Sequence, residues 1–302
     1  MKKKKILIIG GTGFLGFHFA KYCLKKKIDV TSFSRKKPKK NRYLKKVNYL
    51  YGDISREKIV YKKLNSISKN MYVVNFGGEV DHGRIKETFR SHYIGVKNLS
   101  NFFIDKKLKK FLQIGSSLEY GKIKSPQKEN MPVKPDSNYA IAKNNATNYL
   151  LKLHKNTKFP VVIVRPYQVY GPYQDLNRLI PFVIHNCLKN NKFPCSDGKQ
   201  YRDFLFVEDF SKIVFKLLFN KRCAGEIFNV GYGKAYNVKR VINLIQKLVN
   251  RGSPQFGKIN LRQKITIHDD NRIGDFVANK RQSPCRSKWL YFFKITDING
   301  PI

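Results

Sequence analysis

Tyr139 and Lys143 stand four residues apart in the segment NYAIAK. On a helix this spacing puts both side chains on one face. A tyrosine that exchanges a proton near neutral pH needs its anion stabilised, and a nearby lysine ammonium does this. Because the chain is rich in lysine, this spacing alone is as consistent with a pair of surface residues as with a catalytic pair. Ser116, which follows the apolar run FLQI after one glycine, could share a substrate hydroxyl or carbonyl with the tyrosine, so the three residues are candidate catalytic groups.

A second candidate site is the glycine-rich segment GGTGFLG, which follows the apolar run ILII. Glycines spaced in this way between a strand and a helix allow a tight turn, close approach to a pyrophosphate and close helix–strand packing. The free N–H groups at the start of the helix would face the phosphates. The pattern predicts a dinucleotide site rather than an ordinary turn, and its candidate residues are Gly10, Gly13, Phe14, Leu15 and Gly16.

The end of the next predicted strand bears on which dinucleotide binds. An NAD site usually places Asp or Glu there to hold the ribose 2′-hydroxyl. This chain has Ser34 and Arg35 instead, followed by lysines, and Arg35 could clamp a 2′-phosphate. The alternative is one more basic surface loop. We therefore expect NADP(H) in preference, with NAD(H) as the alternative cofactor.

Strands and helices alternate along the first half of the chain, which predicts a doubly wound parallel sheet of the Rossmann type. Apolar runs predict strands at 4–9, 29–34, 47–51, 72–76, 111–114 and 161–164. Helices are expected at 14–25, 85–106 and 137–155, and beyond residue 165 at 178–190, 208–219 and 237–250, with strands at 203–206 and 226–230. We expect residues 1–165 to form an NAD(P)-binding domain and residues 166–302 a smaller α/β substrate-binding region, some of whose strands return to the first sheet.

Composition excludes several classes of protein. The 302 residues include 61 Lys and Arg against 20 Asp and Glu, a formal charge of +41. The lysines are scattered and form no basic arm or aromatic–basic motif, so we expect no nucleic-acid partner but a field that favours anionic small molecules. With 41% hydrophobic residues the chain can form a core, yet it has no apolar run of about 18 residues that could cross a membrane.

The cysteines indicate a reducing compartment. There are five, an odd number, and none form a CxxC pair, so we expect neither a disulfide framework nor a metal site. A cytoplasmic location fits best. The N-terminal lysines and the apolar run after them look like a secretory leader, but glycines interrupt that run, which we interpret as the first strand.

Further motifs follow in a fixed order. They are GDI at 52–54, FGG at 76–78, RPYQVYGP at 165–172, RDF at 202–204 and VED at 207–209. Together with the glycine turn and the candidate catalytic residues, they resemble the extended short-chain dehydrogenase/reductase family, the NAD(P)-dependent sugar-nucleotide epimerases, dehydratases and reductases. The resemblance covers about residues 4–262. It implies a nucleotide-diphosphate sugar as substrate and a homodimer formed through the helices at 85–106 and 137–155.

The same resemblance assigns roles to individual residues. It implies that Ser116, Tyr139 and Lys143 are the catalytic triad. The implied cofactor contacts also include Asp53, Ile54, Phe76, Gly77, Gly78 and Pro166. Gln168, which replaces a usual asparagine, and Arg202 would hold the substrate phosphates, with Arg262 as a second pyrophosphate contact. Beyond Arg262, residues 263–302 are atypical for the family.

Departures from the family pattern bear on the reaction. Members that eliminate water have an Asp-Glu pair where this chain has Ser117 and Leu118, and Glu119 is displaced by one, which on a strand-like segment means the other face. Glu79, Asp81 and His82 follow the fourth strand and could reach the sugar, but we favour the interpretation that they are loop surface.

We therefore expect a reductase of a nucleotide-diphosphate 4-keto-6-deoxyhexose in surface-polysaccharide sugar biosynthesis, because reductases usually draw NADPH. The alternative is an NAD-dependent nucleotide-sugar 4-epimerase, which usually retains its cofactor. A non-catalytic cofactor- or RNA-binding relative is a more distant alternative.

Overall fold

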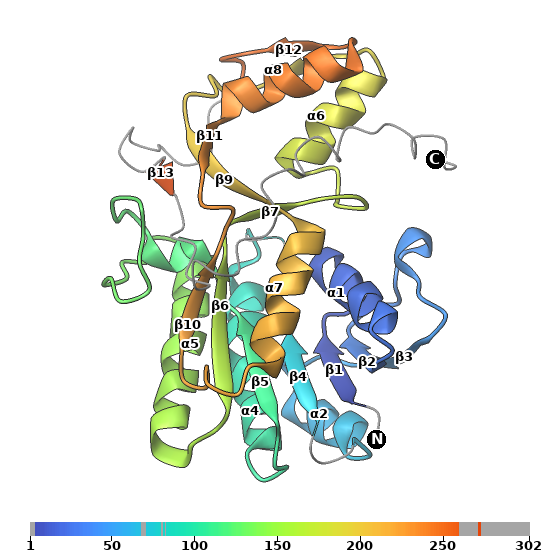
Figure 1. The fold of residues 1–302 in the computed structure, drawn as a ribbon, viewed down its shortest axis with the longest axis vertical. Helices are drawn as coiled ribbons and strands as arrows, with labels where there is room; N and C mark the ends of the chain where they lie inside the picture. Colours follow the sequence, from blue (N-terminus) through green and yellow to red (C-terminus); the bar gives the residue numbers. More distant parts are fainter. Residues whose placement is uncertain (1–3, 68–70, 80, 82, 260–270, 273–302) are drawn as a thin grey trace.

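A seven-stranded parallel sheet forms the body of the molecule (Figure 1). The structure is a computed structural model that describes residues 4–67, 71–79, 81, 83–259 and 271–272. The strand order is β3-β2-β1-β4-β5-β6-β10, and every neighbouring pair is parallel. This confirms the predicted Rossmann-type fold. The order reverses at β1, which lies between β2 and β4, and ligands of such sheets bind at this reversal.

The strands of this sheet are β1 (Lys5–Ile9), β2 (Asp29–Ser34), β3 (Val47–Tyr51), β4 (Tyr72–Asn75), β5 (Lys110–Ile114), β6 (Val161–Pro166) and β10 (Ile227–Val230). The remaining strands are β7 (Gln168–Tyr170), β8 (Lys192–Pro194), β9 (Tyr201–Phe206), β11 (Ala235–Asn237), β12 (Ser253–Gln255) and β13 (Asn271–Arg272). The helices are α1 (Phe14–Lys25), α2 (Glu57–Leu64), α3 (Ile85–Phe89), α4 (Gly95–Phe103), α5 (Asn138–Thr157), α6 (Leu179–Leu188), α7 (Val207–Phe219) and α8 (Val238–Val249). Shorter turns are η1 (Lys40–Arg42), η2 (Arg90–Ile94) and η3 (Ser117–Tyr120).

Helices cover both faces of the large sheet, which explains why its strands are continuous apolar runs. Alternate side chains of β1 show the division: Ile6 and Ile8 pack with α1 and α7, whereas Leu7 and Ile9 pack with α2 and α4 on the opposite face. The chain returns to this sheet after residue 165, because α7 and β10 complete it.

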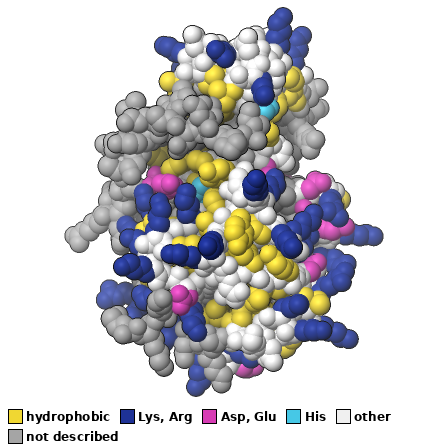
Figure 2. All heavy atoms as spheres, turned by 90° about the vertical axis from the view of Figure 1, so that its right-hand side faces the viewer, with side chains coloured by type: hydrophobic (Ala, Val, Ile, Leu, Met, Phe, Trp, Pro, Cys, Tyr) yellow, Lys and Arg dark blue, Asp and Glu magenta, His cyan; other side chains and the backbone are white. Residues whose placement is uncertain are grey.

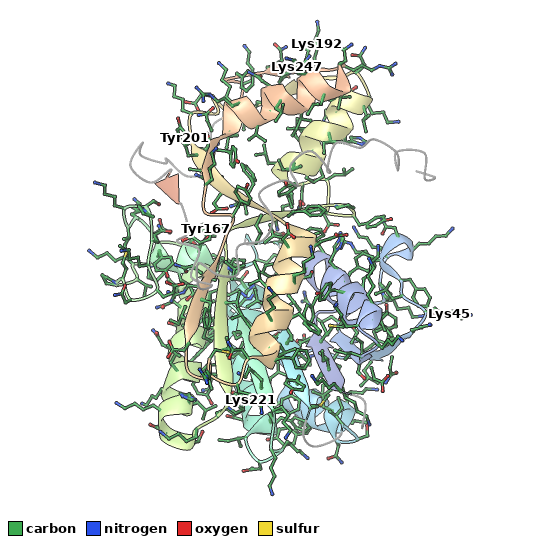
Figure 3. The ribbon with its side chains drawn as sticks, viewed as in Figure 1. Lys45, Tyr167, Lys192, Tyr201, Lys221 and Lys247 are labelled. Atoms are coloured by element: carbon green, nitrogen blue, oxygen red, sulfur yellow. The ribbon has the colours of Figure 1, made fainter. Side chains whose placement is uncertain are left out.

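A smaller unit lies beyond the carboxyl ends of the large sheet (Figure 1). Its strands β7, β9, β11 and β13 form one sheet, and α6 and α8 pack around a separate apolar cluster that includes Phe193 and Phe204. Tyr167 lies at the junction between the two sheets (Figure 3). Its hydroxyl donates to Oε1 of the buried Gln127, at 3.0 Å.

The prediction of a single long helix at 85–106 is wrong in one respect. The segment is helical from 85 to 103, but the π-helical turn η2 interrupts it between α3 and α4. A π turn inserts an extra residue into the helical repeat and often occurs at functional sites. Here it brings Ser91 and His92 against the loop that follows β4.

Charged side chains are spread over the surface. Figure 2 shows Lys and Arg distributed across one whole face, with few Asp or Glu among them. In Figure 3, Lys192 and Lys247, the latter on α8, lie together at one end of the molecule, and Lys221 lies at the opposite end. No helix of the described chain is long and apolar enough to cross a membrane. Within the same residues, no group of three or more His, Cys, Asp or Glu could hold a metal ion.

Candidate active site

The glycine turn between β1 and α1 is shaped to receive a phosphate group. Gly10 has φ +74°, and a side chain on Gly16 would collide with the Gly10 carbonyl oxygen. Gly13 is the N-cap and has no side chain with which to cap the helix, so the first N–H groups of α1 are left to a ligand. Only glycine fits this close approach of turn and helix, and the resulting cradle suits the pyrophosphate of a dinucleotide. Phe14 and Leu15 follow it in the first turn.

Residues at the end of β2 face this turn. Ser34 is buried, and its Oγ accepts a hydrogen bond from Thr12 N at 3.3 Å. The Arg35 guanidinium is not free at the surface: its Nη2 lies 3.1 Å from Glu79 Oε2. The interpretation of Glu79 as loop surface is therefore wrong, because its side chain is only 7% exposed. Asp81 is exposed as expected, and His82 lies outside the described residues.

The other candidate cofactor residues lie at the carboxyl ends of neighbouring strands. Asp53 and Ile54 follow β3, and Asp53 Oδ1 accepts from Ser55 N at 2.8 Å. Phe76, Gly77 and Gly78 follow β4, where Gly77 N lies close enough to Gly10 that a side chain on Gly10 would meet it at 2.9 Å. Pro166 ends β6. Because all these strands are parallel neighbours, the predicted cofactor residues share one edge of the sheet.

Ser116, Tyr139 and Lys143 come together beyond β5. Ser116 is the N-cap of η3, and its Oγ accepts from Leu118 N at 3.1 Å. Its hydroxyl is hydrogen-bonded to that of Tyr139 on α5. Lys143 is 4% exposed, donates to Ile114 O at 2.7 Å and lies 5.8 Å from the centre of the Tyr139 ring. The predicted spacing on one helix face therefore produces a cluster at the end of β5.

Burial shifts the proton affinities of this cluster. It raises the pKa of Tyr139 to about 12, an effect that the hydrogen bond from Ser116 opposes. Burial also lowers the pKa of Lys143 to about 8, while the nearby Glu119 carboxylate acts to raise it. At neutral pH the tyrosine is therefore a phenol and the lysine an ammonium. This arrangement can donate a proton to an oxygen atom and stabilise the anion left behind.

Glu119 lies beneath the cluster. The segment is a 3₁₀ turn rather than strand-like, so the argument that placed Glu119 on the opposite face of a strand is wrong. The side chain is fully buried, accepts from Ser116 N at 2.8 Å and pairs with Arg165 at 2.9 Å. Thr147 Oγ1 donates to the same carboxylate at 2.9 Å. A charged residue at the end of an apolar strand, Arg165, is the signal in the sequence that a buried partner exists.

The candidate substrate residues lie in the smaller unit. Gln168 is on β7 and Arg202 on the neighbouring β9, where Gln168 is in register with Phe204. Alternate residues of a strand share a face, so Gln168 and Arg202 lie on the same side of this sheet. Arg202 Nη1 donates to Tyr201 O at 2.7 Å. Arg262 lies outside the described residues, as does most of the atypical segment 263–302.

Comparisons with known proteins bear on the fold and the family of the chain. The mouse dTDP-D-glucose 4,6-dehydratase is 28% identical over 267 residues, covering 81% of this chain and 74% of that protein. Among solved structures, the UDP-glucose 4-epimerase of Thermotoga maritima with UDP-glucose superposes with a TM-score of 0.87, at 20% identity and 97% coverage of both chains. The dTDP-glucose 4,6-dehydratase of Bacillus anthracis in complex with NAD gives 0.78, at 23% identity and 90% and 87% coverage.

The family model matches three quarters of the chain, including most of the residues predicted to bind the nucleotide. The matched residues, 6–231, run from β1 through the glycine turn and the Ser116–Tyr139–Lys143 cluster to the end of β10. The chain belongs to the NAD dependent epimerase/dehydratase family.

Proposed function

We propose that this protein is an NADP(H)-dependent reductase of a nucleotide-diphosphate 4-keto-6-deoxyhexose that serves surface-polysaccharide sugar biosynthesis. The observation that carries the proposal is the cluster at the end of β5: a protonated Tyr139 bonded to Ser116, with the Lys143 ammonium buried beside it. Family membership and the name of the mouse relative support a nucleotide sugar as substrate.

Each residue of the cluster has a defined part in carbonyl reduction. When bound, the nicotinamide supplies the hydride to C4 of the sugar. Tyr139 donates its phenolic proton to the carbonyl oxygen as charge develops there. When substrate binds, the Ser116 hydroxyl donates its hydrogen to that carbonyl oxygen instead of to Tyr139, while its Oγ still accepts from Leu118 N. Lys143 stabilises the tyrosinate that remains.

Dehydration is disfavoured by the residues around Ser116. Elimination of water needs a second acid–base pair, and the next two side chains are a serine and a leucine. Glu119 cannot take that role, because both of its carboxylate oxygens accept hydrogen bonds from buried protein groups. The chemistry that remains is transfer of a hydride at one carbon atom together with transfer of a proton at the oxygen bonded to it.

A nucleotide-sugar 4-epimerase that uses NAD is the second candidate. Epimerisation oxidises and then re-reduces one carbon, and the same three residues serve both directions. The observation that favours it is Glu79, whose carboxylate lies next to Arg35 near the end of β2. A carboxylate in this region suits the free ribose hydroxyl of NAD better than the phosphate of NADP.

Cofactor content separates the two candidates. The purified protein is denatured, released nucleotide is identified by mass spectrometry, and NADPH and NADH are then titrated onto cofactor-free protein. An empty site that turns over 4-keto-deoxysugar nucleotides with NADPH supports the reductase. Stoichiometric bound NAD, with no net consumption of NADPH by any such substrate, contradicts it and favours the epimerase.

We further propose a homodimer, as the family resemblance implies. The exposed apolar side chains Ile85 and Phe89 on α3 and Ile141 on α5 support it, because these helices pack against each other. Sedimentation velocity is expected to give the mass of two chains, and the charge substitution Phe89→Glu to shift the protein towards monomer. A monomer at micromolar concentration would contradict the proposal. Nucleic acid and membrane are not proposed as partners, and a cytoplasmic location remains an expectation.

A further inference from the structure

An ion pair crosses the mouth of the phosphate cradle. The residue pairs Ile9–Phe33 and Ile9–Asn75 are in register, so β1 lies between β2 and β4. Arg35 extends from beyond β2, and Glu79 from beyond β4. The contact of 3.1 Å between them therefore passes across the end of β1, where the glycine turn begins. A dinucleotide held at this turn must lie against that pair.

The Glu79 side of the pair is fixed in place. Its N–H donates to Ser91 Oγ at 2.9 Å, and its carbonyl oxygen is hydrogen-bonded to His92 Nε2 at 3.0 Å. Gly78 has φ +156°, and any side chain there would collide with the His92 ring. The π turn η2 supplies both Ser91 and His92. The carboxylate is consequently a rigid feature of the site rather than a mobile surface charge.

The Arg35 side chain is less confined than that of Glu79. Its side chain is 42% exposed and lies at the surface end of the pair. Glu79 has a second cation, Arg84, whose Nη1 lies 3.7 Å from the same oxygen. Arg35 can therefore turn towards a bound phosphate while Arg84 stays beside the carboxylate. The pair has one fixed anion and one adjustable cation.

We propose that Glu79 is a specificity-determining residue for the cofactor: its carboxylate opposes the 2′-phosphate that distinguishes NADP from NAD and competes with that phosphate for Arg35. The 2′-phosphate carries roughly two negative charges near pH 7. It gains Arg35 but faces the Glu79 charge, whereas the 2′-hydroxyl of NAD can donate a hydrogen bond to a carboxylate. Glu79 therefore restrains a preference for NADP(H) that Arg35 alone would make strong.

The substitution Glu79→Gln tests this directly. It keeps the size of the side chain and the oxygen that accepts from Asp81 N, but removes the charge. We expect the Kd of NADPH, measured by titration onto cofactor-free protein, to fall about tenfold, as loss of one like charge at close range predicts. The Kd of NADH is expected to stay the same or rise. Equal changes for both cofactors, or none for NADPH, would overturn the inference.

Glu87→Gln is the matched control. Glu87 is an exposed carboxylate on α3 that pairs with Arg84 at 3.3 Å, so the variant removes the same charge from the same neighbourhood without touching the Arg35 contact. Its NADPH-to-NADH affinity ratio is expected to match that of the unmodified protein. A ratio change as large as that of Glu79→Gln would mean that general surface charge, not Glu79, sets the preference.

A second variant guards against misfolding of Glu79→Gln. Arg35→Met changes a partly exposed side chain and leaves Arg84 as the cation beside Glu79, with no arginine from the end of β2 to hold the phosphate. NADPH binding is expected to weaken at least about tenfold, with little change for NADH. Equal losses for both cofactors would refute the role of the pair.

The inference rests on the proposed function only for the class of cofactor. If the unmodified protein binds neither cofactor, the proposed function fails. If it binds them and the variants do not separate them, only the role of Glu79 fails.

Discussion

Burial keeps the Tyr139 hydroxyl protonated, so that this side chain can act as a proton donor. Burial raises its pKa to about 12, so the phenol keeps its proton across the physiological range. Lys143, whose pKa burial lowers to about 8, still carries most of its charge at pH 7. A protonated tyrosine beside a cation is the acid that reduction of a carbonyl requires. The protonation states of Tyr139 and Lys143 therefore make Tyr139 a proton donor before any substrate has bound.

Loss of the Tyr139 hydroxyl should abolish chemistry without disturbing binding. Tyr139→Phe removes the proton donor but keeps the ring that stacks edge-on against His92, with centroids 5.0 Å apart. We expect kcat to fall by about 10²- to 10⁴-fold, the usual contribution of a general acid. Cofactor titration should give an unchanged Kd. A variant that keeps a tenth or more of its kcat would exclude Tyr139 as the proton donor.

The rate of reduction should decline in alkaline solution as Lys143 loses its proton. Its pKa is lowered to about 8, so the stabilising charge is present below pH 8 and is lost above it. The groups that face this cluster are Glu119 on η3, Arg178 and the His92 ring. A profile of kcat against pH should show one ionisation near 8. A rate that stays flat to pH 10 would mean that the charge of Lys143 is not used.

At the scale of elements, one buried ion pair joins three segments around the site. Glu119 belongs to η3, Arg165 is the second-last residue of β6, and Thr147 lies on α5. Arg165 is only 2% exposed, and its guanidinium also lies 4.7 Å from the centre of the Tyr120 ring. The carboxylate also accepts from Ser116 N. The position of the Ser116 hydroxyl is therefore coupled to the packing of η3 against α5 and β6.

Removing one partner of the Glu119–Arg165 pair should lower the free energy of unfolding more than removing both partners. Glu119→Gln leaves the Arg165 charge buried with a weaker partner, and we expect the free energy of unfolding to fall by about 3–5 kcal/mol. The double variant Glu119→Gln/Arg165→Met removes both charges and should recover a large part of that loss. Urea denaturation of the three proteins measures the difference. If the double variant is the least stable, the pair contributes net stability.

At the scale of the whole molecule, charge is the dominant property. The formal charge is +41, and Lys and Arg are distributed over the surface rather than gathered in one patch (Figure 2). Such a field raises the local concentration of small anions without selecting among them. It would favour association with the proposed dinucleotide and nucleotide-diphosphate sugar, while we expect selection at the carboxyl ends of the strands.

Ionic strength should therefore act on binding and not on chemistry. Raising salt from about 20 mM to about 300 mM shortens the range of the field severalfold, so the KM values of both anionic substrates should rise. The kcat should stay within about twofold, because the cluster around Lys143 is buried and poorly screened. The measurement is steady-state kinetics at several salt concentrations with two different salts. A KM that does not change with salt would show that the surface charge has no part in substrate capture.

The large sheet, the glycine turn and the shared helix face of Tyr139 and Lys143 could be predicted from the sequence, whereas the role of Ser116 beside them followed from the family resemblance. Apolar runs predict strands, parallel strands align their carboxyl ends, and a spacing of four residues fixes one helix face, so short-range rules were enough. The expectation that some strands beyond residue 165 return to the first sheet is confirmed by β10, which pairs with β6.

The partners of the charged residues depend on how distant segments of the chain pack together. Arg35 and Glu79 are 44 residues apart, and Arg165 and Glu119 are 46 apart, so periodicity cannot relate them. The sequence around Glu79 indicates a surface loop, but in the structure Ser91 and His92 of η2 are hydrogen-bonded to the Glu79 backbone. Whether a carboxylate lies in solvent or beside a buried guanidinium depends on how distant segments pack. That packing sets the local electrostatic field, and with it the cofactor preference that we assign to Glu79.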